Sequence, residues 1–268
     1  MVAAKTIRRH TGPSAVAIVP ARLGSTRLPR KMLLRETGRF LFEHTVENAL
    51  STGVFERVVL ATDSDEILRA AKDAGIEVLM TSADHQSGTD RVHEAYESLA
   101  AEGLRADVIV NIQGDEPELE PEGLQALTAA FTDPTVELAT LYSEIEAEEQ
   151  AEDPATVKLI VNSDGDALYF SRAKIPVRRD ASAEPVPYLR HIGVYAFRPK
   201  ALREFCELPQ GRLERSESLE QLRWLEAGRR IRCVATKPSP AGIDTLEHYA
   251  AFKARLADRL TFEKETTS

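Results

Sequence analysis

Short apolar runs and helix-like segments alternate along the first half of the chain. Residues 15–20, Ala-Val-Ala-Ile-Val-Pro, form a nearly continuous apolar run, which is typical of a parallel strand buried on both faces. Similar runs follow at residues 57–62, 76–80 and 106–112, and helical patterns lie between the runs at residues 40–51, 65–74 and 89–101. This alternation predicts βαβ units, and therefore an α/β fold built on a doubly wound, mostly parallel sheet.

The pattern changes after Tyr142, where the strand-like pieces become shorter and polar turns separate them. Residues 144–153 hold a run of carboxylates that predicts a solvated helix or loop. Three short strand-like pieces follow at residues 157–161, 167–171 and 191–197. They predict β-hairpins inserted into the α/β body, and we assign residues 157–197 to a subdomain that covers the substrate or forms a dimer.

One further strand-like run at residues 231–236 and an amphipathic helical pattern at 246–260 complete the second half. We therefore place a single domain at residues 14–260. Residues 1–13 and 261–268 are predicted to form a flexible leader and a flexible tail.

Composition and charge narrow the possible functions. Of 268 residues, 43% are hydrophobic and 29% charged, as in a soluble globular protein, and the net charge of -9 argues against a general binder of nucleic acids or membrane surfaces.

Apolar runs are too short for membrane insertion, and the first dozen residues lack the apolar segment of a signal peptide, so we expect a cytoplasmic protein. Cys206 and Cys233 predict neither a disulfide framework nor a zinc site.

A basic loop rich in hydrogen-bond donors follows the first predicted strand. Gly24, Ser25 and Thr26 form a small turn, and four cations surround it: Arg22, Arg27, Arg30 and Lys31. Backbone N–H groups and cations at the end of a parallel strand suit an oligophosphate. The loop matches neither the P-loop nor the GxGxxG pattern, and a solvated basic loop is the alternative interpretation.

Two aspartates, far apart in sequence, occupy similar tight turns after strand-like runs. Asp115 lies between Gly114 and Pro117, and Asp244 follows Gly242. Ligands of open α/β sheets bind at the carboxyl ends of the strands, where both turns are expected. Two carboxylates about 4 Å apart repel by roughly 4 kcal/mol at an effective dielectric constant of about 20. Mg²⁺, which prefers oxygen ligands, would stabilise such a pair, whereas the alternative is two separate helix caps.

Seven motifs, in chain order, resemble those of one enzyme family. They are Pro20-Ala-Arg-x-x-Ser-Thr-Arg-Leu-Pro-x-Lys31, Ala83-Asp-His-Gln-Ser-Gly-Thr89, Val110-Asn-x-Gln-Gly-Asp-Glu-Pro117, Ala167-Leu-Tyr-Phe-Ser-Arg-Ala173, Leu189-Arg-His-x-Gly-x-Tyr195, Leu219-Glu-Gln-Leu-Arg223 and Gly242-x-Asp-Thr245. Together they resemble the 3-deoxy-manno-octulosonate (Kdo) cytidylyltransferases, or CMP-Kdo synthetases. The resemblance implies a fold like that of the nucleotide-diphospho-sugar transferases. It also implies transfer of CMP from CTP to the anomeric hydroxyl of a 3-deoxy-2-ulosonic acid, foremost Kdo, with release of pyrophosphate.

The resemblance also implies roles for individual residues. Those expected to bind CTP are Pro20, Ala21, Arg22, Ser25, Arg27, Lys31, Ser87 and Gly88. Those expected to surround the sugar acid are Arg91, Gln113, Arg172, His191, Tyr195, Glu220 and Gln221. Mg²⁺ is the implied cofactor, with Asp115 and Asp244 as its ligands. Catalysis would rest on Lys31, Arg27 and these two aspartates, mainly through positioning and charge neutralisation. The implied partners are CTP, the sugar acid and a second copy of the chain in a homodimer.

Three positions depart from the family pattern. Arg30 replaces a glycine and adds a charge that we expect beside the triphosphate, and Gly38-Arg39-Phe40 replaces Gly-Lys-Pro. Val177 stands where the family has tryptophan, close to the segment expected to face the sugar. The acceptor could therefore be 8-amino-Kdo or a nonulosonic (acylneuraminic) acid. A catalytically idle nucleotide-binding protein is the alternative from a different functional class.

Overall fold

The computed structural model describes residues 12–25, 27–180, 182 and 186–266. Within these residues the strands form one sheet in the order β3-β2-β1-β4-β8-β5-β9, to which β6 is joined by pairing with β8, and β7 pairs with β6. The strands are β1 Ala15–Ala21, β2 Arg57–Thr62, β3 Val78–Met80, β4 Val108–Asn111, β5 Leu138–Glu144, β6 Lys158–Val161, β7 Ala167–Ser171, β8 Leu189–Phe197 and β9 Arg232–Ala235. The helices are α1 Leu41–Ser51, α2 Asp65–Asp73, α3 Gly88–Ala101, α4 Pro121–Ala129, α5 Glu148–Glu152, α6 Pro199–Glu207, α7 Arg212–Glu217, α8 Leu222–Glu226 and α9 Leu246–Thr266.

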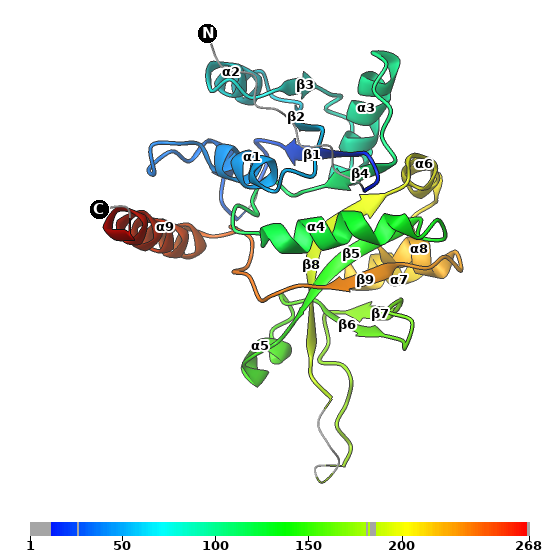
Figure 1. Ribbon diagram of the computed structural model, residues 1–268. Helices are drawn as coiled ribbons and strands as arrows, with labels where there is room; N and C mark the ends of the chain where they lie inside the picture. Colours follow the sequence, from blue (N-terminus) through cyan, green and yellow to red (C-terminus); the bar gives the residue numbers. More distant parts are fainter. Residues whose placement is uncertain (1–11, 26, 181, 183–185, 267–268) are drawn as a thin grey trace.

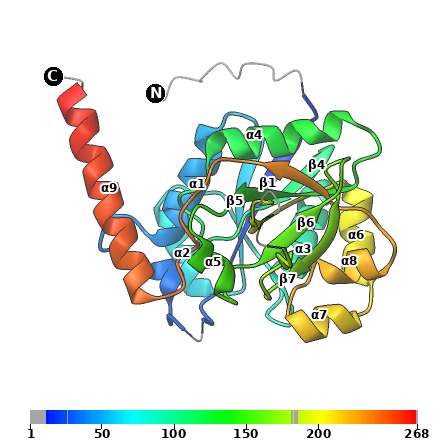
Figure 2. The same cartoon turned by 90° about the horizontal axis from the view of Figure 1, so that it is seen from below.

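Helices cover both faces of the sheet because the inner strands are apolar on both sides (Figures 1 and 2). In β1, Ala15, Ala17 and Val19 pack into one core with α1, α2 and α4, and Val16 and Ile18 pack into a second core with α3, α6 and α8. Strands β3, β2, β1 and β4 run parallel, as do β5 and β9. The predicted α/β fold with a mostly parallel sheet is therefore confirmed.

Strand β8 connects the two halves of the sheet. It runs antiparallel between β4 and β5, with Asn111 opposite Tyr195 and Thr140 also opposite Tyr195. This strand falls within residues 157–197, which we assigned to an inserted subdomain, yet it belongs to the central sheet. Of the described residues in that range, β6 and β7 form the antiparallel hairpin. Alternation of polar and apolar residues in β8 marks a strand, but its partners lie far away in sequence.

The segment between β7 and β8 extends away from the body of the protein (Figure 1). We call its described residues 174–180 and 186–188 the arm. The role of this region as a dimerisation or substrate-covering element remains a prediction.

The ends of the chain differ in how far the structure describes them. The predicted leader lies outside the described residues up to position 11. The predicted flexible tail is helical up to Thr266, because α9 continues through residues 261–266 without a glycine or proline to end it; residues 267 and 268 lie outside the described part. Near its start, α9 packs Tyr249 and Phe252 against Leu28 and Ile243, which anchors the basic loop to the turn of Asp244.

Candidate active site

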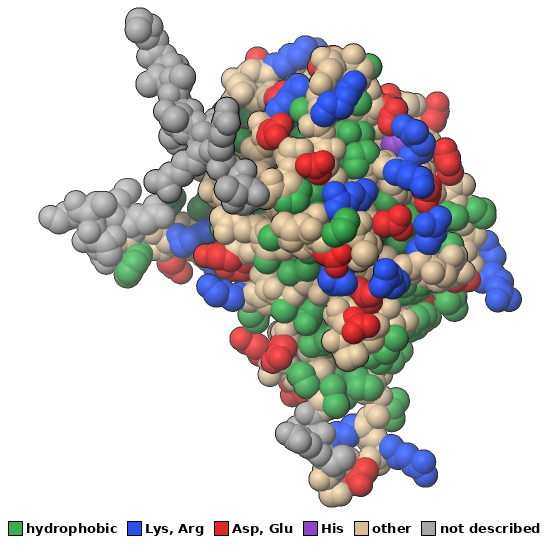
Figure 3. Space-filling model, turned by 45° about the vertical axis from the view of Figure 1, so that its right-hand side comes forward, with side chains coloured by type: hydrophobic (Ala, Val, Ile, Leu, Met, Phe, Trp, Pro, Cys, Tyr) green, Lys and Arg blue, Asp and Glu red, His purple; other side chains and the backbone are tan. Residues whose placement is uncertain are grey.

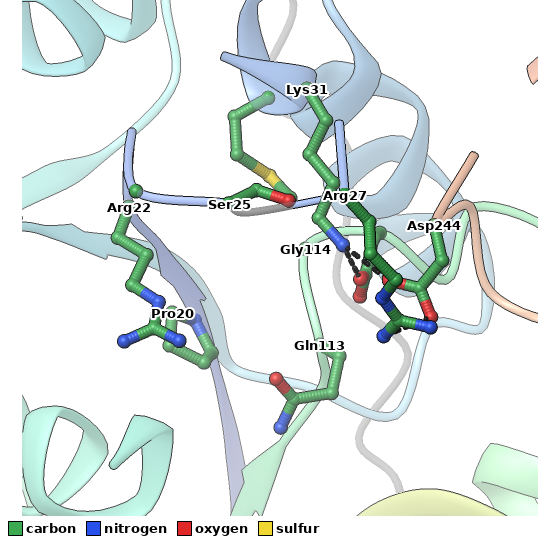
Figure 4. A pocket seen from close by; sticks show the side chains of 11 residues that line it. Pro20, Arg22, Ser25, Arg27, Lys31, Gln113, Gly114 and Asp244 are labelled. Atoms are coloured by element: carbon green, nitrogen blue, oxygen red, sulfur yellow. Dashed lines mark hydrogen bonds and ion pairs between the residues drawn. The ribbon is translucent and has the colours of Figure 1, made fainter. Parts of the chain in front are cut away.

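A pocket of about 280 Å³ opens where β1 and β4 end (Figure 4). Its lining joins the basic loop to the two aspartate turns. The lining residues are Pro20, Arg22, Gly24, Ser25, Arg27, Lys31, Met32, Gln113, Gly114, Asp115 and Asp244. Residues predicted for CTP, for the metal and for the sugar acid thus meet in one cavity. Sequence reasoning did not single out Met32, whose only signal is its place after Lys31.

Local structure explains the shape of the basic loop. Leu28 is buried and donates its N–H to the hydroxyl of Ser25 (3.3 Å), so the loop folds back on itself. Arg30 adopts a left-handed conformation (φ 59°), which favours glycine and explains why a glycine is expected there. Its side chain pairs with Glu66 of α2 and does not line the pocket, which corrects the expectation that it adds charge beside the triphosphate.

The two aspartates converge because their turns dock directly onto each other. The backbone N–H of Ile243 donates to the carbonyl oxygen of Asp115 (2.8 Å). Gly242 permits this approach, since a Cβ at that position would lie 2.8 Å from Oε1 of Glu116. The predicted meeting of Asp115 and Asp244 is therefore present in the structure.

The ammonium of Lys31 lies between the two carboxylates (Figure 4). It contacts Oδ2 of Asp115, lies 2.9 Å from Oδ1 of Asp244 and donates to the carbonyl oxygen of Ile243 (3.2 Å). Burial alone would lower the pKa of Lys31, but the charges and hydrogen bonds of the two aspartates outweigh it and raise the pKa. Arg27 takes the other oxygen of Asp244 (2.9 Å). Both carboxylates therefore face positive charge.

Glu116 adds a third carboxyl group to this region. Burial, followed by the negative charge of Asp115, raises the pKa of Glu116 to about 8. The group is therefore mostly protonated at neutral pH, which limits repulsion among the carboxyl groups. Among the described residues, no cluster of three or more His, Cys, Asp or Glu side chains is arranged to hold a metal. A metal here would draw two ligands from the protein and the others from substrate and water, a donor set that suits Mg²⁺.

Three further residues that the resemblance assigns to CTP, Ala21, Ser87 and Gly88, lie near this pocket. Gly88 lies beside Pro20 and Gln113, since a Cβ on it would be in van der Waals contact with both at 3.5–3.7 Å. Ser87 is the N-cap of α3, and its hydroxyl accepts from the N–H of Asp90 (3.1 Å). Ala21 is buried at the end of β1. None of Ala21, Ser87 and Gly88 is among the residues that line the pocket.

A second group of predicted residues lies around the N-terminal part of β8. The ring of His191 packs against Phe170 (5.0 Å between centroids) and Tyr195 (5.4 Å). Burial, followed by the charge of Arg190, lowers the pKa of His191 to about 3, so the imidazole is neutral. Glu220 accepts a hydrogen bond from Thr89 (2.8 Å).

Two atoms of this second group are buried without a hydrogen-bond partner among the described residues. They are Oε1 of Glu220, an acceptor, and Nε2 of Gln221, a donor. Such orphaned atoms are costly unless a ligand or water satisfies them. They mark a place where a ligand with hydroxyl groups would gain hydrogen bonds.

Two predicted arginines are engaged elsewhere. Arg91 is buried, and its guanidinium donates to Oδ2 of Asp63 (2.7 Å) and to the hydroxyl of Thr81. Arg172 donates to the carbonyl oxygens of Glu217 (2.7 Å), Pro154 (3.0 Å) and Ser218 (3.3 Å). The structure does not bring these two side chains into the pocket, and their contact with the sugar acid stays a prediction.

None of the described helices is both long enough and apolar enough to cross a membrane.

Comparison with known proteins places this site in a family. A cytidylyltransferase family model matches residues 16–231. The 3-deoxy-manno-octulosonate cytidylyltransferase of Lawsonia intracellularis is 46% identical over 248 residues, covering 92% of this chain and 96% of that protein. The protein of the same name from Nitratidesulfovibrio vulgaris strain Hildenborough is 48% identical over 233 residues, covering 86% and 91%.

Solved structures agree with these relatives. A structure of CMP:2-keto-3-deoxy-manno-octonic acid synthetase complexed with CTP superposes with a TM-score of 0.85 at 40% identity, covering 92% of this chain and 99% of that one. The 4-diphosphocytidyl-2C-methyl-D-erythritol synthase of Anaerococcus prevotii shares the fold (TM-score 0.59, 16% identity, coverage 92% and 99%). The chain belongs to the cytidylyltransferase family and, within it, to the 3-deoxy-manno-octulosonate cytidylyltransferases, which are nucleotidyltransferases.

Proposed function

We propose that the protein transfers CMP from CTP to the anomeric hydroxyl of Kdo, with Mg²⁺ as cofactor and pyrophosphate as second product. The observation that carries this proposal is that the carboxylates of Asp115 and Asp244 both contact the ammonium of Lys31 inside a pocket lined by arginines. Kdo as the acceptor is supported by the sequence identity to 3-deoxy-manno-octulosonate cytidylyltransferases, which extends over most of the chain.

The residues that line the pocket are suited to binding a triphosphate. Arg22 and Arg27 line the cavity and would neutralise phosphate oxygens, with Ser25 as a further donor. Asp115 and Asp244 would hold Mg²⁺, which when bound neutralises phosphate charge and can lower the pKa of the attacking hydroxyl. Lys31, beside both carboxylates, offers a positive charge to a phosphate that reaches them. Catalysis would come mainly from positioning and electrostatic stabilisation.

The sugar acid would occupy the space between this pocket and the N-terminal part of β8. Oε1 of Glu220 and Nε2 of Gln221, which make no hydrogen bond among the described residues, suit a polyhydroxylated ligand. His191, neutral and held between aromatic rings, would contribute shape rather than proton transfer.

A coupled pyrophosphate assay tests this function. Release should require CTP, Mg²⁺ and Kdo together, and 8-amino-Kdo and acylneuraminic acids in the same panel decide the acceptor. Asp115→Asn and Asp244→Asn should each lower kcat/KM by about 100-fold or more, whereas Asp258→Asn, on the exposed face of α9, should not. CTP binding without turnover on any acceptor would instead support the idle nucleotide-binding protein.

The metal assignment has a test that does not depend on turnover. Mn²⁺ binding in the presence of CTP, followed by electron paramagnetic resonance, should weaken in both aspartate variants. Unchanged Mn²⁺ affinity in both would remove the aspartates as metal ligands.

A homodimer is part of this proposal, and exposed hydrophobic side chains support it. Val177 and Val186 on the arm are 83% and 67% exposed, and Leu168 on the β6–β7 hairpin is 59% exposed. On the face in Figure 3, hydrophobic side chains gather on the lower part of the molecule, and charges of both signs are interspersed above. Sedimentation at micromolar concentration should give a dimer, and Val177→Asp should shift it towards monomer; a wild-type monomer would contradict the assignment.

A further inference from the structure

A chain of four hydrogen-bonded side chains leads from the second group of residues to the wall of the pocket. Thr89 donates its hydroxyl proton to Oε2 of Glu220 (2.8 Å). Nδ2 of Asn111 donates to the hydroxyl oxygen of Thr89 (3.4 Å), and Nε2 of Gln113 donates to Oδ1 of Asn111 (3.2 Å). Gln113 lines the pocket, so the chain ends where a ligand would bind.

The direction of every bond in this chain follows from its first member. The carboxylate of Glu220 accepts a hydrogen bond from the hydroxyl of Thr89. Because this hydroxyl has a single proton, its oxygen can only accept the hydrogen bond from Asn111. The amide of Asn111 must therefore present Nδ2 to Thr89 and Oδ1 to Gln113. Gln113 in turn must present Nε2 to Asn111, which turns its Oε1 away from the chain. Figure 4 shows this oxygen directed across the pocket towards Pro20.

The two middle residues are too deeply buried to touch a ligand themselves. Asn111 is fully buried in β4 and Thr89 is 2% exposed at the start of α3. Any influence they have on a substrate must pass through Gln113 or Glu220. Held in one orientation, the amide of Gln113 offers an acceptor, which suits a hydroxyl or amino donor and disfavours phosphate oxygens.

We propose that Thr89 and Asn111 are positioning residues for the acceptor sugar, because they fix Gln113 with its carbonyl oxygen towards a hydroxyl of the sugar acid. The inference rests on the proposed function and adds two residues that touch no substrate. The sugar acid, and not the nucleotide, is favoured as the source of that hydroxyl because the chain begins at Glu220. The second carboxylate oxygen of Glu220, Oε1, is buried with only a long ion-pair contact to Arg223 (3.9 Å) and without a hydrogen bond among the described residues.

The matched variants Thr89→Val and Thr89→Ser test the inference. Valine keeps the shape of threonine and removes the hydroxyl, whereas serine keeps the hydroxyl. Thr89→Val should raise the KM for the sugar acid by about tenfold, the effect of leaving buried polar groups unpaired. The KM for CTP should change by less than about twofold, and Thr89→Ser should restore the KM for the sugar acid. A larger rise in the KM for CTP would assign the hydroxyl donor to the nucleotide and overturn the proposal.

A double-mutant cycle separates positioning from a general structural effect. In a Gln113→Ala background, Thr89→Val should raise the KM for the sugar acid by a smaller factor than in the wild type, because the part of its effect that passes through Gln113 is gone. Additive losses would overturn the proposal. Melting temperatures report whether each variant folds, and Asn111→Ala takes the place of Thr89→Val if that variant does not.

The failure of this inference can be told from failure of the proposed function. A wild-type enzyme without turnover on any sugar acid would overturn the function, and the inference with it. An active wild type with an unchanged KM in both Thr89→Val and Asn111→Ala would overturn the inference alone.

Discussion

The ammonium of Lys31 lies 2.9 Å from Oδ1 of Asp244 while also contacting Asp115, 129 positions earlier than Asp244 in the chain. The place between the two carboxylates is therefore built for positive charge. Lys31 fills it in this structure, so a divalent cation bound by the same oxygens would compete with the ammonium.

This competition predicts an unusual effect of Lys31→Met. Without nucleotide, the variant should bind Mn²⁺ more tightly than the wild type, by about tenfold, because a competing charge worth roughly 1–2 kcal/mol is removed. Electron paramagnetic resonance measures the free ion. Lys253→Met, which removes a partly exposed lysine paired with Glu36, should leave the affinity unchanged. Weaker Mn²⁺ binding in Lys31→Met would contradict the competition.

Gly114 should be intolerant of a side chain because the loop of Asp115 packs against β1. A Cβ at this position would lie 3.0 Å from Sδ of Met32 and 3.1 Å from the carbonyl oxygen of Pro20. Gly114→Ala should displace Asp115 and lower kcat/KM by about 10- to 100-fold, the effect of roughly 1–3 kcal/mol of overpacking. Lys72→Ala, at an exposed position of α2, is the control. Equal kinetics in the two variants would contradict this close packing.

The pair of Arg91 and Asp63 should contribute to stability, since Arg91 is almost fully buried. Asp63→Asn leaves that cation without its charged partner and should lower the free energy of unfolding by about 2–3 kcal/mol. Glu77→Gln breaks a more exposed pair with Arg57 and should cost less than about 1 kcal/mol. Urea denaturation compares the two. Similar losses would show that burial does not distinguish the pairs.

His191 should make the protein less stable in acid. Its pKa in the folded state is about 3, below the ordinary value of 6.5, so between these values the unfolded chain takes up a proton that the folded protein does not. The free energy of unfolding should therefore fall as the pH drops from about 6 towards 3, by about 1.4 kcal/mol per pH unit from this residue. His191→Gln should remove that part of the slope, and exposed His248→Gln should not. Identical slopes for wild type and His191→Gln would contradict the assignment.

Local sequence predicted those features that depend on neighbours in the chain. Strand β2 has the expected bounds, Arg57–Thr62, because its apolar run is flanked by polar residues. The turns of Asp115 and Asp244 were predicted to reach the same sheet edge, and the structure joins them. Both predictions rest on patterns of a few residues.

Features that depend on distant segments could not be predicted in this way. The place of β8 between β4 and β5 depends on pairing across roughly 50 to 85 residues. Arg30 turns to Glu66 because α2 lies beside the loop in space. Arg172 gives its donors to carbonyl oxygens of two other turns. Sequence motifs named these residues, but their contacts depend on the assembled fold.

The antiparallel strand β8 also constrains how a newly made chain can fold. Strands β4 and β5 are synthesised before β8, which pairs with one edge of each of them, and β9 is synthesised later still. Until residue 197 has left the ribosome, both strands keep an open row of N–H and C=O groups, which is a template for aggregation. The sheet of the N-terminal half, which carries the basic loop, is therefore completed only after β8 in the C-terminal half has been synthesised.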